Sequence, residues 1–98
     1  MLNDAEYQYH PTVKRYLRKM PQLRWYAAKG DAVAHSILID LRHAIHASEV
    51  LTFKQRRYIQ LWVDGYKVID IAAKHRVSPA TVSQTIKRGS KNISSFLR

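Results

Sequence analysis

Apolar residues recur every three or four positions along most of the chain, which is the spacing of one face of an α-helix. The clearest case runs from Ala32 to about Ala47, with Asp31 as a suitable N-cap. At ~100° per residue its apolar side chains fall within an arc of roughly 140°. They are Val33, Ala34, Ile37, Leu38, Leu41, Ala44 and Ile45. We expect this arc to face the core, with Ile39 and three histidines on the opposite side.

Shorter helical patterns precede this one, after nine residues that we expect to form a frayed arm. The first pattern follows Pro11, a residue that suits a first helical turn. Its apolar positions are Val13, Tyr16, Leu17 and Met20. Pro21 should end or kink this helix. A further segment from about Gln22 to Ala28, stopped by Gly30, is either a separate turn or a kinked continuation.

The second half contains stronger start and stop signals. Thr52 and Gln55 have the spacing of a capping box, which predicts a helix from there to about Asp64. Gly65 is expected to end it in a left-handed conformation. A short helix over Val68–His75 follows, and Ser78-Pro79 is a strong start signal for the last helix. Gly89, within that helix, is either a cap or a small residue at a close contact.

No segment alternates cleanly between apolar and polar residues, and no hairpin turn signal occurs. The sequence therefore predicts an all-α fold. Its 98 residues, 46% of them hydrophobic, suffice for one small core. We expect one continuous fold with two parts: a helical platform over residues 1–50, for dimerisation or partner docking, and a tri-helical part over residues 51–98.

Three helices joined by short turns, the second of them short, match a helix-turn-helix. Val82 and Ile86 should anchor the last helix to the core, and Ala72 should allow its close approach to the helix before it. The outward positions of the last helix are then Ala80, Thr81, Ser83, Gln84, Lys87 and Arg88. Their chemistry suits the edges of DNA bases in the major groove, where Gln can pair with adenine and Lys or Arg with guanine.

Charge strengthens this interpretation. The formal net charge is +10, and residues 51–98 hold ten basic and two acidic side chains, against seven and five in residues 1–50. Such an excess favours a polyanionic partner, and nucleic acid over an anionic membrane surface. We expect base reading by Ala80, Thr81, Ser83, Gln84 and Lys87. We expect phosphate contacts from Lys67, Lys74, Arg76, Ser78, Arg88 and Lys91.

The segment 51–89 resembles region 4 of bacterial sigma factors of the housekeeping superfamily. It is also similar to the helix-turn-helix of LuxR-type response regulators and to small phage-encoded sigma-like activators. The matching marks are Leu-Thr-x-x-Gln-Arg from Leu51, the Gly65 break, Ile71-Ala72-Ala73, and Val77-Ser78-x-x-Thr81-Val82. The resemblance implies promoter contacts by Ala80, Ser83, Gln84 and Lys87. Lys67 and His75 depart from the family pattern, and length excludes a full sigma factor.

Other classes of protein find little support. Cysteine is absent, which excludes disulfides and thiolate metal sites. His35, His43 and His46 share a broad face, but no further ligand is well placed, so we expect no metal and no cofactor. Seven carboxylates and no phosphate-binding glycine loop argue against an enzyme. We find neither a membrane span nor a signal peptide, and expect a cytoplasmic protein.

The sequence thus predicts a transcriptional regulator that reads double-stranded DNA with the helix starting at Pro79. We expect a homodimer, because one recognition helix offers little base contact. The alternative is a protein-interaction module that captures RNA polymerase or another host factor with a sigma-like fold. Leu23, Trp25 and Ile39 would suit a dimer or partner surface, although Leu23 and Trp25 could equally pack against the helix over residues 32–47.

Overall fold

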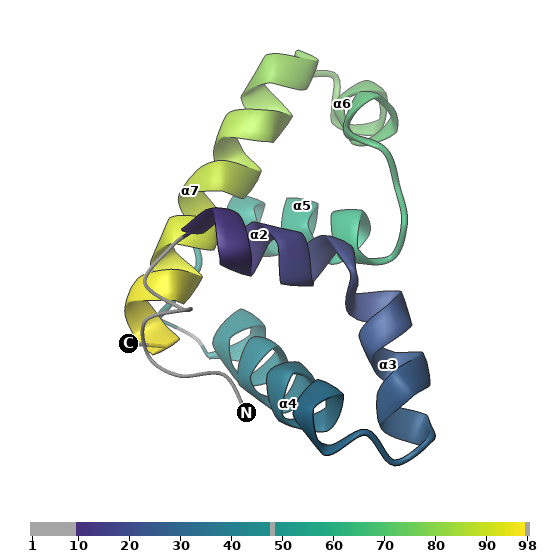
Figure 1. The fold of residues 1–98 in the computed structure, drawn as a ribbon. Helices are drawn as coiled ribbons and strands as arrows, with labels where there is room; N and C mark the ends of the chain where they lie inside the picture. Colours follow the sequence, from purple (N-terminus) through teal and green to yellow (C-terminus); the bar gives the residue numbers. More distant parts are fainter. Residues whose placement is uncertain (1–9, 48, 98) are drawn as a thin grey trace.

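Six α-helices make up the part of the chain that the computed structural model describes, residues 10–47 and 49–97. They are α2 (His10–Arg18), α3 (Met20–Ala28), α4 (Ala32–His46), α5 (Phe53–Val63), α6 (Val68–His75) and α7 (Pro79–Leu97). These residues contain no strand, so the predicted all-α fold is confirmed. Figure 1 shows α2 crossing in front of α5, with α3 and α4 forming one end of the molecule and α6 and the start of α7 the other.

The first two helices are separate. Met20 begins α3 and Pro21 lies in its first turn, where the missing N–H has no helical partner to lose. Val13 and Leu17 on α2 are fully buried, as their spacing predicts. On α3, Leu23 packs against the core while Trp25 remains 55% exposed. Leu23 and Trp25 were the two residues of α3 that we expected to suit a partner surface. Of these two, only Trp25 is exposed.

Helix α4 buries six of the seven predicted core positions. Its N-cap is Asp31, whose Oδ1 accepts a hydrogen bond from the Ala34 amide at 3.0 Å. The prediction for Val33 is wrong, because this side chain is 44% exposed. Val33 lies in the first turn of α4 at the edge of the fold, where the adjoining residues Asp31 and Ala32 are exposed as well.

The turns of the second half follow their sequence signals. Thr52 Oγ1 accepts from the Gln55 amide and Gln55 Oε1 accepts from the Thr52 amide, which completes the capping box. Gly65 has a φ of 104° and ends α5, as expected. The Gln55 oxygen also accepts from Asn92 Nδ2 on α7 at 3.1 Å, so the cap of α5 is tied to a helix 37 residues further on.

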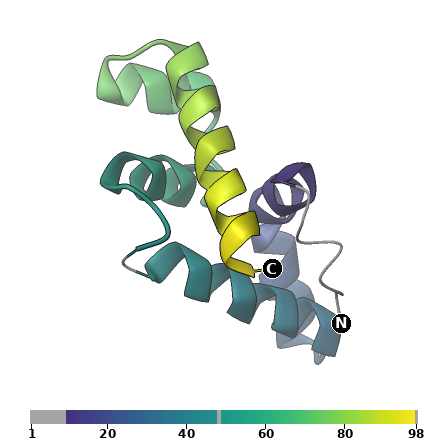
Figure 2. The same cartoon turned by 90° about the vertical axis from the view of Figure 1, so that its left-hand side faces the viewer.

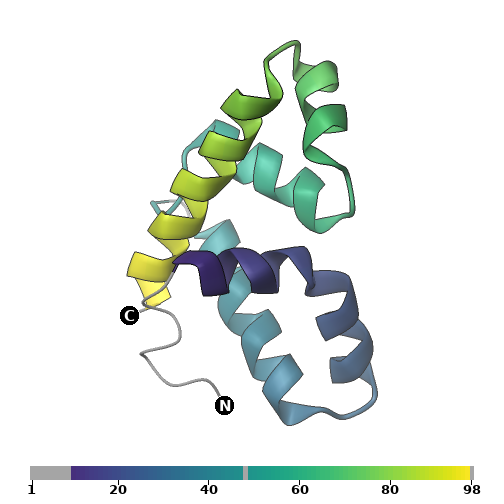
Figure 3. The ribbon, with the colours of Figure 1, turned by 45° about the horizontal axis from the view of Figure 1, so that its top comes forward.

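Helix α7 connects the two ends of the molecule. Figures 2 and 3 show α6 beside its N-terminal half, while its C-terminal half runs down toward α2 and α4. Gly89 lies at the close contact with α5 and not at a cap. A Cβ added there would stand 2.5 Å from Ile59 Cδ1 and 3.4 Å from Gln55 Cβ. Ser90 is buried too, and its hydroxyl donates to the Ile86 carbonyl at 2.8 Å.

We predict that Gly89→Leu lowers the free energy of unfolding by about 1–3 kcal/mol. The larger side chain must displace Ile59, which is fully buried in the core. Denaturant unfolding followed by circular dichroism measures the change. Lys91→Leu, two residues along the same helix at an exposed position, should shift the free energy by less than about 0.5 kcal/mol. Equal effects of the two substitutions would contradict the close-contact role of Gly89.

Candidate nucleic-acid interface

The turn between α6 and α7 fixes how the two helices cross. Arg76 ends α6 in the left-handed region, with φ 55° and ψ 44°, a conformation that costs a non-glycine residue some strain. The next amide, of Val77, donates to the Ala72 carbonyl at 3.0 Å, and the Val77 side chain packs against the core. Ala72 is buried, as the predicted close approach requires. The helix pair is therefore held by the sharp turn at one end and by apolar packing along its length.

The inner face of α7 is anchored where the sequence predicts. Val82 is fully buried and Ile86 is 1% exposed. His75, on α6, is half-buried; its Nδ1 lies 3.0 Å from the Ile71 carbonyl and its ring meets Tyr58 edge-on at 4.8 Å. Val82 and Ile86 thus hold the N-terminal half of α7 against α5 and α6, and the contact of His75 with Tyr58 joins α6 to α5. The opposite face of α7 is consequently left to solvent.

All the residues proposed to read bases are exposed and lie on this opposite face. They are Ala80, Thr81, Ser83, Gln84 and Lys87. In the described part of the chain, the side chains of Ser83 and Gln84 form no hydrogen bond. Thr81 differs, because its Oγ1 is 2.8 Å from Ser78 Oγ. Ser78 Oγ also accepts from the Thr81 amide at 3.1 Å, which confirms its role as the cap of α7.

The cations proposed to contact phosphate are exposed as well. They are Lys67, Lys74, Arg76, Arg88 and Lys91. None of them forms an ion pair with a carboxylate of the described residues. Lys74 does contact an aromatic ring, since its Nζ lies 5.9 Å from the Tyr66 ring centroid. The structure therefore places unneutralised positive charge on α6, on α7 and at the turn between them.

Arg56, in contrast, has a structural role that the sequence analysis missed. Its Nε donates to the Ile45 carbonyl at 2.7 Å and its Nη2 to the Ala47 carbonyl at 2.9 Å. These groups belong to the C-terminal end of α4, which leaves several carbonyls without a helical partner. The sequence shows that α4 needs a cap, because no glycine follows it, but it does not show which residue supplies one. Of the ten basic residues in residues 51–98, Arg56 thus stabilises the fold.

A second group of cations lies outside the predicted interface, on α2. A depression of about 310 Å³ is lined by Lys14, Arg15, Arg18, Lys19 and Trp62. The net charge of residues 1–50 does not reveal this group, because acidic residues elsewhere in that half offset its positive charge. The charge of a shorter segment does reveal it, because residues 10–30 contain six Lys or Arg and no Asp or Glu.

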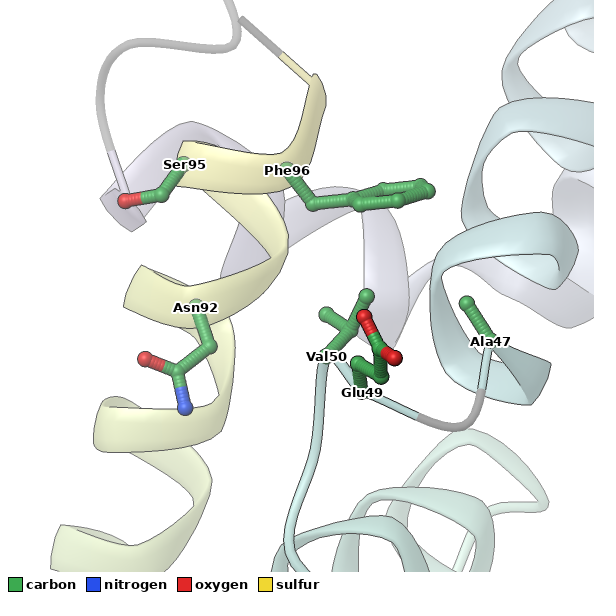
Figure 4. A pocket seen from close by; sticks show the side chains of 6 residues that line it. All are labelled: Ala47, Glu49, Val50, Asn92, Ser95 and Phe96. Carbon is green, nitrogen blue, oxygen red and sulfur yellow. The ribbon is translucent and has the colours of Figure 1, made fainter.

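Two further depressions differ in chemistry. The larger, about 580 Å³, lies between the end of α4 and the C-terminal half of α7 and is shown in Figure 4. Its lining includes the Glu49 carboxylate and the Phe96 ring but no Lys or Arg, so it does not suit a polyanion. The other, about 270 Å³, is lined by side chains of α3, α4 and α5, among them Arg24 and Asp64, which pair at 3.9 Å.

Among the described residues, no group of three or more His, Asp or Glu side chains is arranged to hold a metal ion. In particular, His43 contacts the Phe96 ring edge-on at 5.5 Å. None of the helices in this part of the chain is long and apolar enough to cross a membrane. Comparison of the chain with models of protein families, with curated proteins and with solved structures found no match in any of the three.

We predict that Arg56→Ala lowers the free energy of unfolding by about 1–3 kcal/mol, because the carbonyls at the end of α4 lose their donors. Arg57→Ala removes the same charge from the adjoining, exposed position and should cost less than about 0.5 kcal/mol. Thermal and denaturant unfolding of the two variants checks this difference. Equal stability of the two variants would mean that the Arg56 hydrogen bonds contribute nothing.

Proposed function

We propose that the chain is a transcriptional regulator that binds double-stranded DNA with the N-terminal half of α7 in the major groove. One observation carries this proposal: the anchored helix exposes Ser83, Gln84 and Lys87, which have no partner among the described residues, and the cations beside them form no ion pair there. Base reading is assigned to Ala80, Thr81, Ser83, Gln84 and Lys87. Phosphate contact is assigned to Lys67, Lys74, Arg76, Ser78, Arg88 and Lys91.

The order of residues along α7 supports this assignment. Small side chains at Ala80 and Ser83 let the start of the helix, with its positive dipole end, approach the DNA closely. Gln84 and Lys87 follow on the same face one turn further on, where longer side chains are needed to reach the bases. The resemblance of residues 51–89 to sigma region 4 agrees with this arrangement. The proposal is of a binding protein rather than an enzyme.

The direct test is selection of bound sequences from a random pool of duplexes, followed by titration of the selected site at several salt concentrations. Contact with about five to seven phosphates should give a linear log–log plot with a slope near −0.9 per contact. A protein that enriches no sequence, or that binds duplexes with no salt dependence, would not fit the proposal. The second outcome would favour the protein-interaction alternative, in which RNA polymerase is the partner.

We predict that Gln84→Ala weakens binding to the selected site by roughly 1–3 kcal/mol and leaves binding to unrelated duplexes unchanged. Gln offers one acceptor and two donors, which match the N6 and N7 edge of adenine. Folding stability should shift by less than about 0.5 kcal/mol, because the side chain is exposed. Fluorescence anisotropy with a selected and a scrambled duplex measures both affinities.

Lys91→Ala is the matched contrast, since it alters the same helix at a proposed phosphate contact. It should weaken binding to both duplexes about equally and flatten the salt slope by about one unit. Uniform weakening by Gln84→Ala as well would remove Gln84 from the base-reading set.

We also propose that the protein binds DNA as a homodimer. Four apolar side chains of α3 and α4 are 44–55% exposed and form what we term the α3–α4 surface: Trp25, Tyr26, Val33 and Ile39. Burying such side chains against a second copy would stabilise association. This surface belongs to helices other than α6 and α7, so a dimer formed through it leaves the proposed DNA-binding face of each copy free.

We predict that light scattering gives about twice the chain mass of 11.4 kDa and that Ile39→Glu restores the monomer. A charge placed within an apolar contact would be buried without a partner, which is costly. Ser83→Glu, at an exposed position on α7, should leave the mass unchanged. A monomer mass for the unaltered protein, both free and bound to DNA, would reject the dimer and favour docking of this surface on RNA polymerase.

A further inference from the structure

The cations of α2 form a compact group on the surface, which we term the α2 basic surface: Lys14, Arg15, Arg18 and Lys19, with Trp62 at its base. Four positive charges occur within six residues, three of them on α2 and the fourth at Lys19, which directly follows this helix. Arg15, Arg18 and Lys19 are exposed, while Lys14 is half-buried. Together they line a depression of about 310 Å³, which concentrates their charge toward one bound group.

Trp62 gives this surface a fixed geometry. The indole is 8% exposed and belongs to the core, yet Arg18 Cζ lies 5.5 Å and Lys14 Nζ 5.9 Å from its ring centroid. The negative face of the ring attracts both cations. Two long side chains are therefore held near one position before any ligand arrives. Cations ordered in this way lose less conformational entropy when they bind an anion.

No carboxylate of the described residues forms an ion pair with these four cations. The ion pair formed nearby, Arg24 with Asp64 at 3.9 Å, involves neither α2 nor Trp62. Helices α2 and α3 contain no acidic residue at all. Among the described residues, the charge of this surface is thus not neutralised by any carboxylate.

Helix α2, which carries most of the α2 basic surface, packs directly against α7. Figures 2 and 3 show α2 beside the C-terminal half of α7, and Figure 1 shows it in front of α5. The described molecule extends 40 × 26 × 22 Å, whereas one turn of B-DNA is about 34 Å long. A duplex that extends by about one turn beyond the site held by α7 is therefore long enough to span the distance to α2.

We propose that the α2 basic surface is a second DNA-binding surface, which contacts backbone phosphates beside the site that α7 reads. It rests on the proposed function and adds to it a role for the N-terminal half. Each phosphate would be held by the guanidinium of Arg15 or Arg18 or by a lysine ammonium, without reading the sequence. The surface lengthens the segment of DNA that the protein covers.

The test removes two exposed cations that do not lie over Trp62. Arg15→Ala with Lys19→Ala should flatten the log–log salt slope by about 1.8 units on a selected duplex of about 30 base pairs, roughly three helical turns. The ratio of affinities for selected and scrambled duplexes should not change. Circular dichroism should show unchanged helix content and melting, because both side chains are exposed.

The matched control, Arg24→Ala with Arg42→Ala, removes the same charge from α3 and α4, at the depression lined by side chains of α3, α4 and α5. It should change the slope by less than about half a unit. An unchanged slope in the Arg15 and Lys19 variant, or an equal change in the control, would overturn the inference while leaving the proposed function intact.

Other outcomes separate the remaining alternatives. If the unaltered protein binds no duplex in a salt-dependent way, both the proposed function and this inference fail. If a labelled poly-glutamate peptide binds the unaltered protein but not the Arg15 and Lys19 variant, and the DNA slope is unchanged, the surface serves an acidic protein partner and the inference is wrong.

Discussion

The close approach of α7 to α5 at Gly89 is the contact on which the rest of the arrangement depends. Helix α7 is one rod of 19 residues, so fixing one half of it sets the direction of the other. Its C-terminal half is buried through small residues, Gly89, Ser90 and Ser94, which let the neighbouring helices come near. The N-terminal half needs only Val82 and Ile86 to hold its inner face. An exposed helix face can therefore be rigid without being covered.

The cations of this protein differ in what holds them, and charge alone would not distinguish them. The Arg56 guanidinium donates hydrogen bonds to carbonyls at the end of α4. Arg18 is attracted to an aromatic ring, which orders it but leaves its charge unneutralised. Lys87 has no described partner. A net charge of +10 thus resolves into cations that stabilise the fold, cations that are pre-positioned, and cations free to meet a polyanion.

Local signals predicted the fold well because the interactions behind them are local. The Thr52 capping box, the Gly65 turn and the Ser78 cap each involve residues within five positions of one another. The prediction that Val33 is buried was wrong because the periodicity of apolar residues does not show where the helices that cover them end. Arg56 and the pairing of Arg18 with Trp62 could not be predicted from spacing, since each joins helices whose relative placement is set by the whole core.

The same limit applies within the candidate interface, where the requirements of folding and of recognition compete for particular atoms. Starting a helix at Pro79 commits Ser78 Oγ to the Thr81 amide and to the Thr81 hydroxyl. What Thr81 can still offer a base is its methyl group and the remaining capacity of that hydroxyl. Ser83 and Gln84 lie beyond the cap and carry no such commitment. Because the capping turn uses the first hydroxyls of the helix, the proposed discrimination between bases would rest mainly on the second turn of α7.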